Sequence, residues 1–529
     1  PIPSAIGSRH GMPSLTTALS QMHFPKNHES FVTARRRLAF EELFLGQIAV
    51  QLRRREWRAR RDGVPVSWVR SSIDSYLDGL DFDLTSEQQE VLKTVLGEMS
   101  SDVPMGRLLQ GEVGSGKTVV AVGALLGAAS DRFQGAFMVP TEVLAEQHFL
   151  SMSADLNSYP YQQLPSVVSE ATVPGFGDRP LRIALLTGGL ATSVKRHVKS
   201  MLTKGEIDIV IGTHALFQET VKIPRLALVV VDEQHRFGVD QRGALTDQRP
   251  RPHLLCMTAT PIPRSLALTL YGDLDLSTLR ELPAGRQTVK TTWAQSKKSR
   301  AEANDLIIDE VRSGRQAFVV CPLIEPSDEV LARSAVEEYK RLSDREFAGL
   351  SIGLLHGRMA IPVKRRTMDQ FRSGDLQVLV ATPVIEVGID VPNATVMLIE
   401  SADRFGLSQL HQLRGRVGRG KYLSHCLLLT DSPSEDARRR LSVLSSTSDG
   451  FALADEDLRL RGPGEYLGTR QTGFANLKIA SFQDVDILDL ARHEVAGLLD
   501  KDPTLNDRDH RLLLAHADRM IKGKPGDIS

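Results

Sequence analysis

The sequence predicts an α/β fold in which two tandem domains, each built on a parallel sheet, are flanked by helical segments. Two observations predict it. From about residue 76 to 290, short β-rich runs alternate with helix-length segments, which is the pattern of βαβ units. The same pattern restarts after the turn-forming residues 283–285. The expected strands are 106–110, 136–140, 183–187, 207–212, 226–232 and 254–258, then 316–322, 351–355, 378–381, 394–400 and 425–430.

The length of 529 residues is enough for roughly three to four domains. We expect a helical lead-in over residues 1–75, the first α/β domain over 76–290 and the second over 291–440. Residues 441–529 are expected to be mostly helical, with a Gly-rich element at 461–473. The chain has no low-complexity tract.

Bulk charge does not point to a partner, because the 65 basic residues balance the 65 acidic ones. Any nucleic-acid contact must come from local surfaces. Arginine clusters at 35–37 and 53–61 are one candidate, and either they form the solvated face of a long helix or they contact phosphates.

Membrane and metal functions are not indicated. No apolar run approaches the roughly 18 residues that span a bilayer, and the start lacks the order of a secretory signal. Cys256, Cys321 and Cys426 are scattered and form no CxxC pair, which argues against a zinc site or a disulfide framework. We expect a cytoplasmic protein.

Residues 111–118 match the phosphate-binding loop G-x-x-x-x-G-K-[ST] between an expected strand and an apolar helix at 119–129. Its glycines allow backbone N–H groups to face phosphate oxygens, and the helix N-terminus adds positive potential. Lys117 is expected to reach the β- and γ-phosphates and Thr118 to bind Mg²⁺. The predicted nucleotide-binding residues of this loop are Gly111, Glu112, Val113, Gly114, Ser115, Gly116, Lys117 and Thr118.

The apolar strand at 226–231 runs directly into Asp232 and Glu233. Asp232 is expected to meet the metal, directly or through water, and Glu233 to polarise the attacking water as general base. Such a pair alone commonly marks a solvated strand end. Together with the phosphate loop it predicts nucleotide hydrolysis.

Arg416 and Arg419 lie three residues apart in the run Q-L-R-G-R-V-G-R at 412–419 of the second domain. A guanidinium supplied from the opposite domain stabilises charge in phosphoryl transfer and makes hydrolysis depend on domain closure. A basic turn is the alternative. We predict that both arginines complete the nucleotide site.

With the segment 258–260, these motifs resemble superfamily-two helicases in order and spacing. Within that superfamily the chain most resembles the RecG family of branched-DNA helicases, in the segments 257–267, 384–394 and 402–412. The resemblance covers nearly the whole chain. The resemblance implies two RecA-like motor domains driven by ATP and Mg²⁺. It also implies a monomer acting on forks and Holliday junctions in recombination and repair, with single-stranded DNA-binding protein as a partner.

The resemblance also assigns residues. It implies that Gln88 reads the adenine edge and Phe82 stacks on the ring, although Thr85 in the same motif also suits a helix N-cap. Residues 140–142 and 212–214 resemble motifs that contact the DNA backbone. The resemblance further implies that Thr258 and Thr260 couple the ATP state to the grip on DNA. It places Gly388 and Asp390 in the second-domain motif near nucleotide and DNA.

The Gly-rich element 461–473 has the RecG form rather than that of the transcription–repair coupling translocase, the alternative family. It implies that Arg470 and Gln471 form a translocation lever, although an ordinary helix connection is also possible. Gln471→Ala should then weaken fork processing and largely spare ATP hydrolysis. Two positions depart from the family pattern: Glu112 replaces the usual Asp, and Pro383 replaces the usual Thr.

Nothing in the sequence resembles the many short strands of the family's N-terminal wedge domain. We therefore expect the linker, motor and C-terminal parts without the wedge, and weak junction selectivity. An ATP-binding switch without translocation and a non-enzymatic DNA-binding module are the alternatives from other classes. DNA stimulation of ATP hydrolysis would separate a motor from both.

Overall fold

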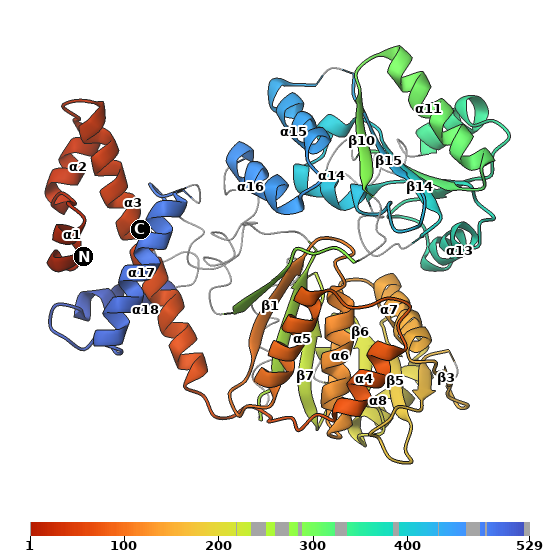
Figure 1. Ribbon diagram of the computed structural model, residues 1–529, viewed down its shortest axis with the longest axis horizontal. Coiled ribbons are helices and arrows are strands. Elements are labelled where there is room, and N and C mark those ends of the chain that lie inside the picture. The colour runs from red at the N-terminus through yellow and green to blue at the C-terminus, as the bar shows by residue number, and fades with distance from the viewer. Residues whose placement is uncertain are drawn as a thin grey trace.

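The structure is a computed structural model with two α/β lobes and a helical module beside them (Figure 1). The described residues are 2–164, 166–217, 220–233, 250–259, 274–283, 288–322, 336–383, 391–431, 433–461, 477–481 and 484–522. Both lobes are RecA-like parallel-sheet domains, so the predicted fold class is confirmed. No helix in these ranges is both long and apolar enough to cross a bilayer.

The first lobe is built on a nine-stranded sheet in the order β3-β4-β5-β6-β2-β7-β8-β1-β9. Its strands are β1 (Gly106–Gly111), β2 (Gln134–Met138), β3 (Tyr159–Pro160), β4 (Val168–Ala171), β5 (Leu181–Leu186), β6 (Ile209–Gly212), β7 (Leu226–Val231), β8 (His253–Thr258) and β9 (Asp275–Leu279). Strands β1, β2, β6, β7 and β8 are buried along their whole length, as expected for parallel strands covered on both faces. Among the described strands of this sheet, the antiparallel pairs are β3 with β4 and β4 with β5, at one edge.

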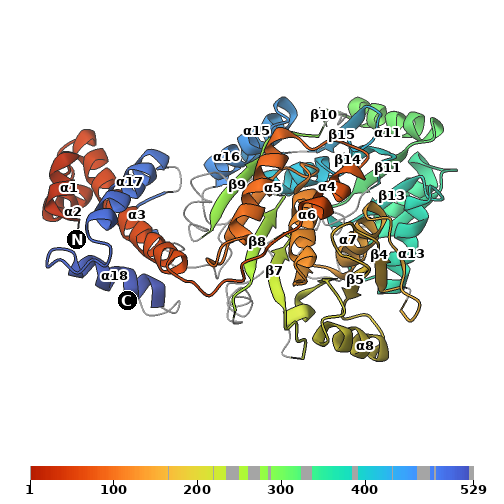
Figure 2. The same cartoon turned by 60° about the horizontal axis from the view of Figure 1, so that its bottom comes forward.

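Helices cover this sheet and bring its functional loops to one edge. They are α4 (Arg70–Asp78), α5 (Ser86–Met99), α6 (Lys117–Ser130), α7 (Glu142–Asp155) and α8 (Thr192–Thr203). Helices α4, α5 and α6 lie together over one face (Figure 2). Because β1, β2 and β7 are parallel neighbours or near neighbours, the segments that follow them meet at the carboxyl edge of the sheet.

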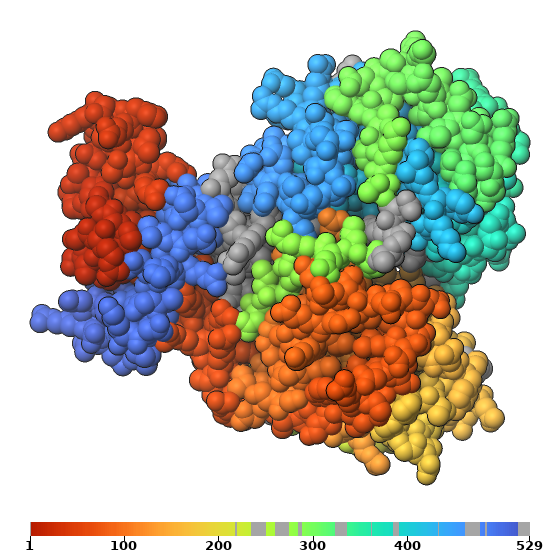
Figure 3. All heavy atoms as spheres, in the orientation of Figure 1, coloured from red at the N-terminus to blue at the C-terminus, as the bar shows by residue number. Residues whose placement is uncertain are grey.

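The second lobe has a six-stranded, fully parallel sheet in the order β10-β15-β14-β11-β13-β12. Its strands are β10 (Val289–Ala294), β11 (Gln316–Val320), β12 (Ile352–Leu355), β13 (Val378–Ala381), β14 (Ala394–Ile399) and β15 (Ser424–Leu429). Its helices include α11 (Lys297–Arg312), α13 (Ile361–Arg372), α14 (Leu407–Arg414), α15 (Glu435–Ser446) and α16 (Gly450–Arg461). Figure 3 shows this lobe seated above the first.

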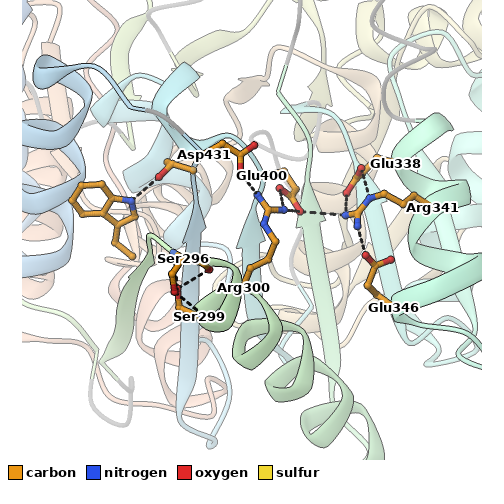
Figure 4. A network of polar contacts seen from close by, with 10 residues as sticks. Ser296, Ser299, Arg300, Glu338, Arg341, Glu346, Glu400 and Asp431 are labelled. Atoms are coloured by element: carbon orange, nitrogen blue, oxygen red, sulfur yellow. Dashed lines mark hydrogen bonds and ion pairs between the residues drawn. The ribbon is translucent and has the colours of Figure 1, made fainter.

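A polar network fixes the helices of the second lobe to the end of β14 (Figure 4). The buried Glu400 carboxylate accepts two bonds from Arg300 of α11, at 2.8 and 3.0 Å. Arg341 lies 3.6 Å from the same carboxylate and also pairs with Glu338 and Glu346. Burial raises the pKa of Glu400, and the two guanidinium groups act against that effect.

The helical module joins the two ends of the described chain. It consists of α1 (Ser4–Arg9), α2 (Leu15–His23), α3 (His28–Arg58), α17 (Val485–Lys501) and α18 (Arg511–Lys522) (Figure 1). Its core includes Phe40 and Phe44 of α3 with Leu488 and Val495 of α17.

The arginine clusters of α3 and the residues after it are used largely within the protein. The pairs are Arg35–Asp484, Arg36–Asp486, Arg55–Asp500, Arg54–Asp275, Arg58–Asp275 and Arg61–Asp102. Each exposed pair contributes at most about 1 kcal/mol, but together they fix the direction of α3 between α17 and β9. These arginines therefore have partners within the protein, and their contact with phosphates stays a prediction.

The expected strands are confirmed within two residues at each end, while four strands were not predicted. Strands β9 and β10 are only half-buried, and β3 and β4 are short edge strands. Two expected domain boundaries fall inside helices. Residue 75 lies in α4, because Val64 and Ile73 already belong to the first-lobe core, and residue 441 lies in α15 of the second lobe.

Candidate functional site

The phosphate loop connects β1 to α6 with the geometry that its glycines permit. Gly114 and Gly116 have φ values of 81° and 79°, in the left-handed region that residues with a Cβ disfavour. A Cβ on Gly111 would lie 2.4 Å from Ser115 Oγ. The turn is therefore closed tightly around the start of α6, where N–H groups without intrahelical partners face the loop.

Lys117, the first residue of α6, turns its ammonium back into the loop. Nζ donates to the carbonyl oxygens of Gly111 and Glu112, both at 2.8 Å. Its charge lowers the pKa of Asp232 and opposes the rise in the pKa of Glu233. The ammonium thus bonds to the loop backbone and acts electrostatically on the two carboxyl groups after β7.

Gln88, the predicted adenine-reading residue, lies against the phosphate loop. Its side chain is fully buried, Nε2 donates to the Ser115 carbonyl at 2.8 Å, and Oε1 accepts the Thr85 N–H at 2.9 Å. Thr85 is the N-cap of α5, which confirms that alternative. The amide of Gln88 therefore supports the phosphate loop through the Ser115 carbonyl, and its contact with adenine stays a prediction.

Asp232 follows β7 and interacts with groups from β2, α7, the phosphate loop and the next residue. Its N–H donates to the carbonyl of Met138 at the end of β2, and its Oδ2 lies 3.4 Å from Nε2 of His148 on α7. Burial acts to raise the pKa of Asp232, but His148, Lys117 and the N–H of Glu233 outweigh it and lower the pKa. The group is therefore an anion suited to a divalent cation.

Glu233 has the opposite electrostatic setting. Burial and the neighbouring Asp232 charge raise its pKa to about 7, against the attraction of Lys117 and Arg416. Its backbone has φ 52°, a conformation that costs free energy in a residue with a side chain and is concentrated at functional sites. A carboxylate with a pKa near neutrality is suited to accept a proton.

Both lobes line one cavity of about 1000 Å³. Lys117, Thr118, Asp232, Glu233 and Phe82 line it from the first lobe, and Arg416 and Arg419 line it from the second. Phe82 is 43% exposed, so its ring is available for stacking. Arg416 is 6% exposed, and its charge acts on Glu233 across the interface.

Other predicted residues are distributed as follows. Thr258 ends β8 and is buried, and Glu142 of the 140–142 segment accepts the N–H of Gly189 at 2.9 Å. Thr260, Gly388, Asp390, Arg470 and Gln471 lie outside the described residues. His148 was not predicted. The available signal was its place on the helix that follows β2, the neighbour of β7.

Comparisons with known proteins identify similar helicases. A DEAD/DEAH box helicase model matches residues 85–269, a helicase conserved C-terminal domain model matches 299–421, and a model of RecG domain 3, C-terminal, matches 447–524. The chain is 46% identical over 523 residues to an ATP-dependent DNA helicase RecG of Synechocystis, covering 99% of this chain and 59% of that protein. It is 41% identical over 527 residues to the RecG of Bacillus subtilis, covering 99% of this chain and 73% of that protein.

A solved structure of RecG bound to a three-way DNA junction is also similar. It aligns with a TM-score of 0.73 at 40% identity, covering 93% of this chain and 61% of that one. The chain thus spans between about three fifths and three quarters of the length of these relatives.

Proposed function

The chain belongs to the RecG family of ATP-dependent DNA helicases, and we propose on that premise that it is an ATP-driven motor that moves on branched double-stranded DNA. One observation supports this function most directly. The groups that would bind and cleave the nucleotide line one cavity from two lobes, so the reaction and the relative position of the lobes depend on each other.

Binding begins at the phosphate loop. Lys117 would exchange the carbonyls of Gly111 and Glu112 for phosphate oxygens, and the N–H groups of the loop would hold the β-phosphate. Thr118 and Asp232 present a hydroxyl and an anionic carboxylate to the same cavity, which are the hard oxygen ligands that Mg²⁺ requires. Bound Mg²⁺ would neutralise charge on the phosphates.

Hydrolysis would use Glu233 and the two arginines. The Glu233 carboxylate takes a proton from the water that attacks the γ-phosphorus, and ADP leaves with the electrons of the broken P–O bond. Arg416 and Arg419 stabilise the transferring phosphoryl group from the second lobe. Loss of phosphate removes the attraction between the lobes and lets them separate.

The chain moves along DNA if each lobe binds the sugar–phosphate backbone with a different strength when the lobes are closed and when they are apart. Contacts to sugar–phosphate are independent of sequence and weaken with salt. The similar solved structure holds RecG on a three-way DNA junction, and we extend branched DNA, including forks and Holliday junctions, to this chain. We further propose a monomer, single-stranded DNA-binding protein as a partner, and a cytoplasmic location in keeping with three buried thiols.

ATP turnover with and without a three-way junction tests the function. A motor hydrolyses ATP faster with the junction and unwinds one arm of it. An ATP-binding switch would bind nucleotide with no stimulation by DNA, and a passive DNA-binding module would bind the junction without hydrolysis. Either result would contradict the proposed function.

A further inference from the structure

A contact outside the catalytic groups joins the phosphate loop to helix α16 of the second lobe. Oε1 of Glu112 accepts the backbone N–H of Gly450 at 2.5 Å. Gly450 is the first residue of α16, and N–H groups of the first turn lack intrahelical partners and favour a negative charge. A side chain of the nucleotide-binding loop therefore accepts the first N–H of a helix in the opposite lobe, beside the Asp449 carboxylate, which accepts the next two.

The contact requires glycine at position 450. A Cβ there would lie 2.5 Å from Nε2 of His411 and 2.8 Å from Oε1 of Glu112. Both atoms are at the ends of side chains, so an alanine would displace them without moving the backbone.

The turn that precedes α16 is fixed to the helix that leads to the catalytic arginines. The Arg414 guanidinium of α14 is 5% exposed and donates to the carbonyls of Leu444, Thr447 and Ser448 at 3.0, 2.8 and 3.0 Å. Its Nη2 also lies 3.0 Å from Nδ1 of His411. The Arg414 side chain thus holds two carbonyls of the turn and one at the end of α15, and the turn cannot shift relative to α14 without breaking these bonds.

A second contact crosses the lobes beside the first. The guanidinium of Arg280, which follows β9, lies 4.8 Å from the ring centroid of Phe451 in α16. Arg280, Phe451, Glu112, His411 and Arg414 all line a cavity of about 260 Å³. The start of α16 is therefore enclosed by groups from both lobes.

Glu112 is also in contact with the ammonium that is expected to bind phosphate. Its carbonyl accepts from Lys117 Nζ at 2.8 Å and from the N–H of Ser115 at 3.1 Å. An ammonium has three donors, and a phosphate in the loop would compete with this carbonyl for one of them. One residue thus meets the phosphate-binding lysine through its backbone and α16 through its carboxylate.

We infer that Glu112 is a positioning residue that transmits occupancy of the phosphate loop to α16. This role rests on the proposed function, in which ATP drives the motor, and α16 begins the part of the chain, residues 447–524, that matches RecG domain 3, C-terminal. It deepens that function by naming a direct contact, separate from Arg416 and Arg419, through which the loop reaches that part.

Hydrogen exchange at the start of α16, measured on peptides within 447–460 with and without Mg²⁺ and AMP-PNP, tests the inference. We expect the nucleotide to change exchange about tenfold in the wild-type chain, the factor appropriate to a hydrogen bond with a charged acceptor. Glu112→Ala and Gly450→Ala should lose the change. Glu112→Gln keeps the reach and an acceptor oxygen, so it should retain part of the change.

Gly497→Ala is the matched control, because Gly497 lies within α17 and a Cβ there meets nothing within 4 Å. It should respond to nucleotide like the wild type. Binding of a fluorescent ATP analogue, measured on every variant, ensures that each one is loaded, and thermal melting ensures that it is folded. The full nucleotide response in loaded Glu112→Ala would overturn the inference.

The two proposals fail in different ways. A wild-type chain whose α16 responds to AMP-PNP but whose turnover ignores DNA would defeat the proposed function alone. A wild-type chain with junction-stimulated turnover and no nucleotide response at α16 would defeat only the role of Glu112.

Discussion

Gln88→Ala distinguishes support of the phosphate loop from recognition of adenine. The change removes the bond from Nε2 to the Ser115 carbonyl and the bond from the Thr85 N–H to Oε1, both in or near the protein interior. Each lost bond costs about 1 kcal/mol, so the loop loses about 2 kcal/mol of its ordering. If that ordering is needed for binding, the affinity for nucleotide falls about 30-fold.

The assay is kcat/KM for ATP and for GTP, measured on wild type, Gln88→Ala and Gln89→Ala. A loop that has lost its support handles every triphosphate less well, so both values should fall by the same factor in Gln88→Ala. Gln89 is the matched control, because it is the next residue of α5 and its exposed side chain bonds only to the Leu84 carbonyl among the contacts described. Gln89→Ala should behave like wild type.

The opposite pattern would refute this reasoning. If Gln88→Ala lost activity with ATP while activity with GTP was unchanged or increased, the amide must leave its buried position and read the base. The role implied by the family resemblance would then hold, and the contacts with Ser115 and Thr85 would be incidental.

Four further changes test the site and the fold. Lys117→Ala should abolish hydrolysis while binding of a labelled junction survives; retained turnover would contradict the assignment of Lys117. Arg416→Ala should lower kcat by about 10³-fold with little effect on the KM for ATP, as expected of a group that acts in the transition state. A rise in KM as large as the fall in kcat would argue against this role. The general base must be ionised, so kcat should rise with pH through about 7. Glu233→Gln should abolish this rise and lower the rate roughly 10²- to 10⁴-fold. An unchanged rise in the variant would assign the titration to another group. Burial lowers the pKa of His253, whose Nδ1 accepts the Met105 N–H, so the unfolded chain binds a proton more readily than the folded one. The free energy of unfolding should therefore be unaffected by this group above about pH 6.5 and fall below that pH. In urea unfolding, His253→Gln should show a smaller fall of this free energy with decreasing pH.

The central strands could be predicted because they are covered on both faces. Leu226–Val231 is apolar throughout, and such a short apolar run is typical of a parallel strand buried on both faces. Strand β10 alternates between half-buried and exposed positions at a sheet edge, and β9 is half-buried over most of its length. Their sequences carry no comparable signal.

The catalytic groups were predictable for a different reason. The phosphate loop and the Asp232–Glu233 pair are local motifs whose spacing is set by one turn of backbone. The position of Gln88 was not predictable, because the same amide chemistry suits either a base edge or a loop carbonyl. His148 and Glu112 act across elements that are distant in sequence, and only the assembled fold brings them to Asp232 and Gly450.

The pairing of α3 with α17 has a consequence for synthesis of the chain. Arg35 and Asp484 meet although 449 residues separate them. At about 5–20 residues per second, α3 leaves the ribosome roughly 20–90 seconds before its partner helix exists. During that interval Phe40 and Phe44 have no α17 to cover them, so α3 is made before both lobes but buried after them, and nascent chains should engage chaperones at this segment until α17 has emerged.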